Sequence, residues 1–131
     1  MLKRKESENI DEIKSILAEG LKIEGNIYAE GKIRIDGEVT GDVRGKFVIL
    51  GQSSKINGNV YAEVVVAMGN IEGNVEAKKL DVKASAKIKG DVVAENFSVE
   101  PGASLHGLVK VGSYREFSEN TLESSSAGTK E

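Results

Sequence analysis

The stretch that decides the fold is residues 71–92, IEGNVEAKKLDVKASAKIKGDV, which begins and ends with the same five-residue pattern. The pattern is aliphatic-x-Gly-x-aliphatic, centred on Gly73 in the first copy and on Gly90 in the second. Between the copies, small or apolar residues alternate with polar ones, and the alternation changes phase once, between Ala77 and Leu80. Alternation with a step of two is typical of a strand with one buried face, and the phase change predicts a corner.

The pattern occurs six times at nearly constant spacing. Its central glycines are separated by 16, 17, 15, 17 and 17 residues and are Gly25, Gly41, Gly58, Gly73, Gly90 and Gly107. A unit of this length is too short for two paired helices or a propeller blade. It suits one coil of a β-solenoid, whose neighbouring strands lie about 4.8 Å apart. We therefore predict an all-β, single-domain solenoid of about six coils within residues 15–112.

Each central glycine has a predicted role, and so does the residue after it. The glycine lets the chain turn tightly, or approach a neighbouring coil where a Cβ would clash. A polar residue that tolerates turns and bonds the local backbone follows it in five copies: Asn26, Asp42, Asn59, Asn74 and Asp91. A calcium-binding ladder would need more acidic residues than these two aspartates supply.

The composition of the 131 residues favours β structure and disfavours catalysis. There are 14 Val and 11 Ile against 8 Leu, with 15 Gly and 5% aromatic residues. No cysteine and one histidine exclude a disulfide framework, a thiolate metal site and any mechanism that needs two imidazoles. The net charge of −3 implies no basic surface for nucleic acid. No run approaches the ~18 apolar residues of a membrane span, and the start lacks the apolar stretch of a secretory signal, so we expect a cytoplasmic protein.

The two ends of the chain differ from the repeats in composition. Residues 1–14 are mostly charged, and residues 113–131 are polar with a run of serines at 124–126. Such segments bury too little apolar surface to offset the entropy of ordering. We therefore expect disordered N-terminal and C-terminal tails.

The last repeat departs from the others in a way that suggests assembly. It carries Leu108 where earlier copies have Asn or Asp, and its other exposed candidates are Leu105, Val109 and Val111. An apolar edge of in-register strands is a template for another subunit. The alternative is a local cap formed by residues 113–118, which contain Tyr114 and Phe117.

The N-terminal end of the repeats offers a second candidate interface. A first, incomplete coil is predicted from Ile16, Leu17, Leu21 and Ile23. Joining like end to like end gives isologous contacts and a filament without polarity. The sequence leaves open whether the rods join in this way or head to tail.

The repeats resemble a known family, the bactofilins. The resemblance rests on the six pentads and the run KIRIDGEVTGDV at residues 32–43, and it covers about residues 15–112. It implies a right-handed, three-faced parallel β-helix that polymerises end to end into non-polar filaments without nucleotide or other cofactor. It also implies a bacterial cytoskeletal role in cell shape, cell-wall synthesis, polar organisation or motility.

The same resemblance implies a membrane contact and protein partners. Family members carry a short N-terminal membrane-targeting segment, which here matches Met1, Leu2, Lys3, Arg4 and Lys5. Its single strong apolar side chain besides Met1 binds lipid weakly, but many copies along a filament act together. A peripheral position at the inner face of the cell membrane is implied, with cell-wall enzymes or polar scaffold proteins as partners.

Enzyme and sugar-binding alternatives find little support in the residues. A β-helical acyltransferase would need His106 as its base, but its coils would have a regular 18-residue repeat, and no acid lies near His106 to orient it. A sugar-cleaving β-helix would need clustered carboxylates with aromatic residues for stacking, and the six aromatic residues here are scattered. A small acyltransferase or a sugar-binding module is the alternative function. Residues 41–47 contain Gly and Lys but lack the spacing of a phosphate-binding loop. We therefore expect no enzyme activity.

Overall fold

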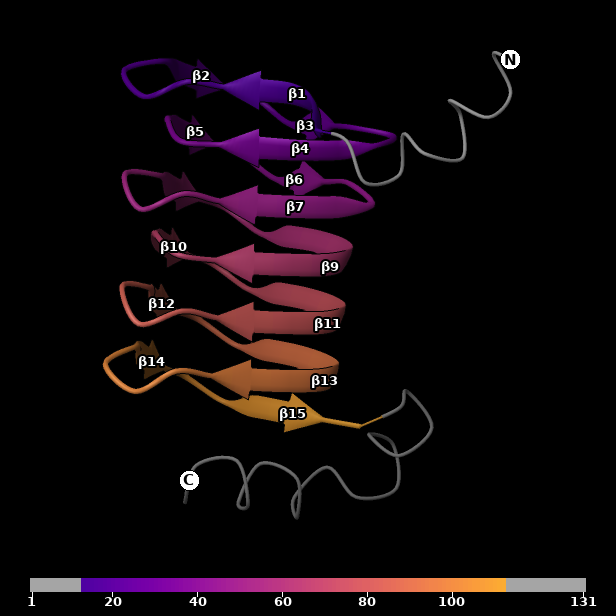
Figure 1. Ribbon diagram of the computed structural model, residues 1–131, viewed down its shortest axis with the longest axis vertical. Helices are drawn as coiled ribbons and strands as arrows, with labels where there is room; N and C mark the ends of the chain where they lie inside the picture. Colours follow the sequence, from indigo (N-terminus) through magenta and orange to yellow (C-terminus); the bar gives the residue numbers. More distant parts are fainter. Residues whose placement is uncertain (1–12, 113–131) are drawn as a thin grey trace.

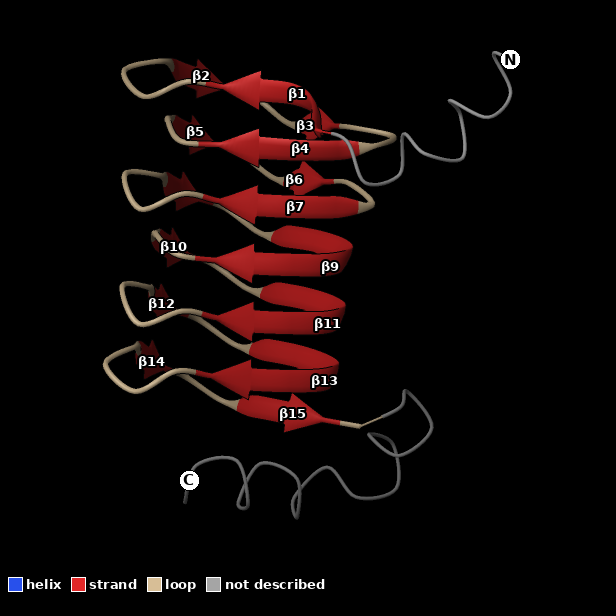
Figure 2. Cartoon of the chain, in the orientation of Figure 1, coloured by secondary structure: helices blue, strands red, loops and turns tan. Residues whose placement is uncertain are grey.

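The computed structural model describes residues 13–112, and the regular secondary structure there consists only of strands (Figures 1 and 2). Every strand pairing is parallel, and the coils stack from β1 at one end of a rod to β15 at the other (Figure 1). The predicted all-β solenoid of six coils is confirmed. The predicted tails lie outside the described residues, except that β1 begins at Ile13.

Each coil contributes strand residues to three faces, which we number by the order in which the chain meets them. Face 1 contains β1 (Ile13–Leu17), β4 (Lys32–Ile35), β7 (Phe47–Leu50) and the second halves of β9 (Val60–Ala67), β11 (Val75–Val82) and β13 (Val92–Val99). Face 2 contains β2 (Lys22–Glu24), β5 (Glu38–Thr40), β8 (Lys55–Asn57), β10 (Asn70–Glu72), β12 (Lys87–Lys89) and β14 (Ser104–His106). Face 3 contains β3 (Ile27–Tyr28), β6 (Val43–Arg44), the first halves of β9, β11 and β13, and β15 (Val109–Val111).

The core is a set of aliphatic columns that run along the rod. Val65 and Leu80 are in register on face 1 and fully buried, and Ile71 and Ile88 are in register on face 2 and fully buried. β-Branched side chains pack well at such alternating positions. The predicted alternation fails at Ala84, which is exposed because the chain leaves the strand there and turns.

The predicted corner between Ala77 and Leu80 is confirmed. Ala77 is in register with Ala94 on face 3, Lys79 is in register with Asn96 on face 1, and Lys78 between them has no partner in the register. The corner residue therefore lets one strand serve two faces, since the inward phase shifts by one position across it.

The central glycines stack in one column at the corner between faces 2 and 3. All six have φ values between 133° and 154°, a conformation that side-chain-bearing residues rarely adopt. In coils 2 to 6, a Cβ on this glycine would overlap the carbonyl oxygen of the glycine one coil earlier. Both predicted roles of the glycine, the turn and the close approach, are therefore confirmed.

The Asn and Asp side chains beside this column bond the next coil rather than the local backbone. Each side-chain Oδ1 accepts a hydrogen bond from the backbone N–H of the equivalent residue one coil later, at 2.9–3.2 Å. The series begins at Asn26 and ends at the N–H of Leu108. The local prediction was wrong because coil stacking places the next N–H within reach of each side chain.

The uneven spacing of the repeats comes mainly from the corner between faces 1 and 2. This corner has two residues at 36–37 and 68–69, and four residues in the other coils, at 18–21, 51–54, 83–86 and 100–103. Figure 1 shows the longer corners as wide loops beside β2, β12 and β14. A further residue at the corner 29–31 accounts for the remaining difference, so the strands keep their register while the sequence period varies.

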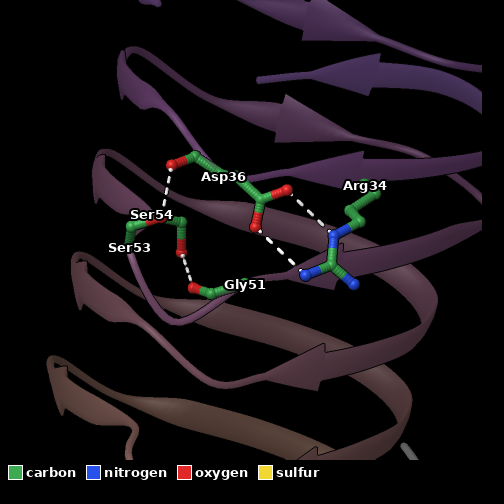
Figure 3. A network of polar contacts seen from close by, with 5 residues as sticks. All are labelled: Arg34, Asp36, Gly51, Ser53 and Ser54. Carbon is green, nitrogen blue, oxygen red and sulfur yellow. Dashed lines mark hydrogen bonds and ion pairs between the residues drawn. The ribbon is translucent and has the colours of Figure 1, made fainter. Parts of the chain in front are cut away.

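A polar network joins a short corner to the longer one below it (Figure 3). Asp36 accepts two hydrogen bonds from the Arg34 guanidinium, at 2.9 and 3.2 Å, and its backbone oxygen accepts one from the Ser53 hydroxyl at 3.1 Å. The buried Ser54 hydroxyl donates to the Gly51 carbonyl at 2.7 Å. The network ties coil 2 to coil 3 and leaves the buried hydroxyl satisfied.

Candidate assembly surfaces

The C-terminal end of the rod exposes core positions that interior coils bury. Leu105 on β14 is in register with the fully buried Ile88, yet it is only partly buried. Val111 is in register with the buried Ala94 and is 36% exposed. Within the described residues, no seventh coil lies over these side chains.

The remaining two predicted residues of this end have different environments. Leu108 follows the last central glycine and is 46% exposed, whereas Val109 is only 6% exposed and belongs to the core. Val109 therefore supports the last coil from within. Leu108 is the residue most open to an approaching subunit.

Sequence reasoning missed two further residues of this end surface. Phe97 and Val99 are in register with the buried Leu80 and Val82, and Val99 is 43% exposed because the stack ends there. Their alternating apolar pattern in the last repeat was visible in the sequence. The sequence did not show that the last described strand, β15, lies on face 3, so that among the described residues no strand follows the face 1 strand of coil 6.

The N-terminal end contains the predicted residues in two different roles. Leu17 and Ile23 are partly buried and in register with the core residues Ile35 and Val39, so they form the open end of the core. Leu21 lies in the corner of coil 1 and is exposed. These three side chains form an apolar surface at the first coil.

Ile16 belongs to the side of the rod rather than to its end. It is in register with Arg34, which points outward on face 1, and it is 61% exposed. The sequence did not separate this residue from Leu17, because the bulge between Ile13 and Ser15 that sets the phase of β1 becomes visible only in the register. Ile16 therefore faces whatever lies alongside the rod.

The two ends differ in their side-chain hydrogen bonds. At the first coil, Gly25 has nothing within 4 Å of the position a Cβ would take, so the glycine column is open there. At the last coil, the Leu108 N–H donates a hydrogen bond to Asp91 Oδ1 of the preceding coil, but Leu108 has no side-chain oxygen to accept one from a following coil. A C-terminal end placed on an N-terminal end therefore cannot continue the Asn/Asp series.

A cluster of charged side chains fastens the last coil to the one before it. Asp81 accepts a hydrogen bond from the Ser98 hydroxyl at 2.9 Å and lies 3.1 Å from the Lys83 ammonium, which lies 3.5 Å from Glu100. Burial raises the pKa of Asp81, but the contacts with Ser98 and Lys83 outweigh it and the pKa lies below its usual value. Asp81 therefore keeps its charge and its partners at neutral pH.

Among the described residues, His106 has no hydrogen bond or ion pair with an acidic side chain. It is exposed on β14, and the residue beside it in the register is Lys89, a cation rather than the carboxylate that orients a general base. Among residues 13–112, no group of three or more His, Asp or Glu side chains could hold a metal ion. The acyltransferase alternative gains no support.

The shallow hollows on face 3 do not offer an uncovered Tyr61 ring on which a sugar could stack. They are lined by Tyr61 together with Tyr28, Arg44 and Glu76. The Arg44 guanidinium lies 4.3 Å from the centre of the Tyr61 ring and covers one side of it. Arg44 therefore already stacks on the Tyr61 ring, at the position where a sugar would stack.

The predicted membrane-targeting residues, Met1, Leu2, Lys3, Arg4 and Lys5, lie outside the described residues. Across residues 13–112, no helix has the length and apolar character needed to span a membrane.

Comparison with known proteins identifies the family. The sequence matches the family described as Bactofilin, polymer-forming cytoskeletal, over residues 15–110. Neither the search of curated proteins nor that of solved structures found a match. The matched residues include all six pentads and nearly the whole solenoid. The chain therefore belongs to the bactofilins, a structural family of polymer-forming cytoskeletal proteins.

Proposed function

We propose that this chain assembles end to end into filaments without nucleotide, and that the filaments lie on the inner face of the cell membrane as a scaffold for cell shape or cell-wall organisation. The observation that carries the proposal is the pair of open solenoid ends. Core positions such as Leu105 and Leu17 are partly exposed there, although their neighbours in the next coil are fully buried. A second copy at each end would bury them and extend the sheets.

The difference between the two ends supports filaments without polarity. Head-to-tail contact would bring Leu108 to the place where every interior coil offers an Asn or Asp oxygen. Contact between two C-terminal ends instead places apolar side chains against apolar side chains through a two-fold axis. Strands at such a junction run antiparallel, unlike the parallel strands within the rod.

Electron microscopy of the purified full chain tests the assembly proposal directly. Filaments are expected in buffer without nucleotide or divalent cations. Averaged images of them should show a two-fold axis at every junction, with two kinds of junction alternating along the filament. Small uniform particles at high protein concentration would contradict filament formation. Filaments whose subunits all point in one direction would contradict only the absence of polarity.

The membrane part of the proposal predicts that the first five residues contribute to lipid binding. Deleting residues 1–5 removes Lys3, Arg4 and Lys5, each of which contributes about 1 kcal/mol of attraction to an anionic surface. Co-sedimentation with vesicles containing phosphatidylglycerol is expected to weaken about tenfold or more. Filaments should still form, because the deleted residues precede the first coil. Unchanged sedimentation would remove this role for the segment.

A further inference from the structure

One side of the rod carries an apolar patch that the core does not need. On β7, Val48 and Leu50 are fully buried, so Phe47 and Ile49 point outward on face 1. On β9, Val65 and Ala67 are fully buried, so Val64 and Val66 point outward beside them. The register pairs Phe47 with Val64 and Ile49 with Val66, which makes a contiguous block of four outward side chains. We call this block the face 1 patch.

The fold itself does not require apolar residues at these outward positions. The equivalent outward positions of coils 5 and 6 on the same face are Lys79, Asp81, Asn96 and Ser98. On face 2, the outward positions of β5 and β8 are polar throughout, with Thr40 in register with Asn57. A cluster of outward aliphatic and aromatic side chains on an otherwise polar rod marks an interaction surface.

Cationic side chains border the face 1 patch on both sides along the rod. Lys32 and Arg34 lie one coil before it, and Lys79 lies one coil after it. The Lys32 ammonium sits 4.4 Å from the centre of the Phe47 ring, so cation and apolar surface are in contact. Arg34 pairs with Asp36 at 2.9 Å and Lys83 pairs with Asp81 at 3.1 Å, so these two pairs are neutral. The cationic border of the patch therefore consists of Lys32 and Lys79.

The arrangement matches the chemistry of an anionic lipid surface. Apolar side chains enter the boundary between headgroups and acyl chains, and lysine side chains at their border bind the anionic headgroups. The exposed Ile16 lies on the same face, in register with Arg34. Residues 1–12 join the rod at Ile13, also on this face. The first described residue therefore lies on the face that carries the patch.

A second copy of the chain fits the patch less well than a lipid surface does. Four partly buried side chains offer much less than the roughly 800 Å² per partner that a stable protein pair buries. Packing two such faces in antiparallel rods would also place Lys32 of one copy against Lys79 of the other. A membrane gives each patch a partner without this repulsion, and the subunits of one filament add their contacts.

We infer that face 1 is the membrane-facing side of the rod, and that the face 1 patch with its bordering cations binds anionic lipid headgroups and the acyl chains below them. This inference rests on the proposed membrane association and adds a second contact to the first five residues. A weak N-terminal segment and a weak patch in one chain bind together more strongly than either alone. The filament is then held with one defined side towards the membrane.

The double variant Ile49→Glu/Val66→Glu tests the inference in the full chain. The affinity of this variant for vesicles of mixed phosphatidylcholine and phosphatidylglycerol is expected to be lower than that of the parent by about tenfold or more. Thr40→Glu/Asn57→Glu is the matched control, because it adds two carboxylates at paired outward positions of adjacent strands on face 2. The control should bind vesicles like the parent. Circular dichroism and electron microscopy verify folding and filaments for both.

The remaining outcomes separate this inference from the proposed function. Filaments of the face 1 variant that bind vesicles as well as the parent would overturn the inference and leave filament formation untouched. Loss of filament bundling without loss of vesicle binding would assign the patch to a second copy and also overturn it. The chain without residues 1–5 could still bind vesicles. If Ile49→Glu/Val66→Glu then removes this binding, the inference holds and the N-terminal segment is not required.

Discussion

Replacing Leu105 by Arg is expected to abolish filament formation while the chain remains folded. Leu105 occupies a core position in the last coil, but the open end lets a longer side chain extend into water. A subunit that stacks on this end would bury the guanidinium without a partner, at about 3–5 kcal/mol. The concentration needed for assembly is then expected to rise about a hundredfold or more. Sedimentation and negative-stain microscopy measure this rise.

The neighbouring His106 provides the matched control for this prediction. His106→Arg adds the same side chain one residue later on β14, where it points outward on face 2. These filaments should resemble those of the parent. If Leu105→Arg lowers stability, Leu108→Arg makes the same test at an exposed position. Long filaments from both variants would show that the C-terminal end is not an interface.

Replacing Gly73 by Ala is expected to cause the largest loss of stability. Gly73 has a φ of 153°, and its new Cβ would overlap the carbonyl oxygen of Gly58 in the coil before. The backbone conformation alone costs about 1–3 kcal/mol for a residue with a side chain. Moving two stacked coils apart adds to this, and the free energy of unfolding should fall by about 4 kcal/mol or more. Urea denaturation followed by circular dichroism measures the change.

Gly25→Ala separates the two contributions. Gly25 has a φ of 133°, but nothing lies within 4 Å of its added Cβ because coil 1 begins the stack. Its unfolding free energy should therefore fall only by the backbone cost of about 1–3 kcal/mol. Equal losses in the two variants would mean that the backbone conformation, and not the close approach of coils, makes glycine necessary.

Much of the fold was predictable because its repeating unit is short and its core is uniform. The spacing of the six glycines indicated a solenoid, and the phase change near Lys78 located a corner. These features repeat, so each copy confirms the interpretation of the others. The interior of the rod is filled by small or aliphatic side chains at alternate positions, and this alternation is visible in the sequence.

The candidate surfaces were less predictable, because they depend on where coils lie relative to one another. The oxygen of Asn74 reaches the N–H of Asp91, which is 17 residues away, and no local rule anticipates that bond. The outward direction of Ile16 depends on a bulge at the start of β1. The outward block on β7 and β9 was hidden by runs such as Val64–Val66, where inward and outward residues are equally apolar.

The stacking of each coil on its neighbours has a consequence for how filaments grow. Paired residues of adjacent coils are separated by only 15 to 19 positions, so each coil folds against the one beside it and distant coils do not interact. The open end of a folded rod therefore exposes the same strand edges and core side chains as a partly folded rod to which the next coil has not yet been added. In the proposed filaments a second molecule would cover this end instead, through an antiparallel junction, and the entropy of bringing two chains together would replace the entropy of closing a short loop. If the chain assembles as proposed, we expect protein concentration, and not a bound nucleotide, to control polymer length.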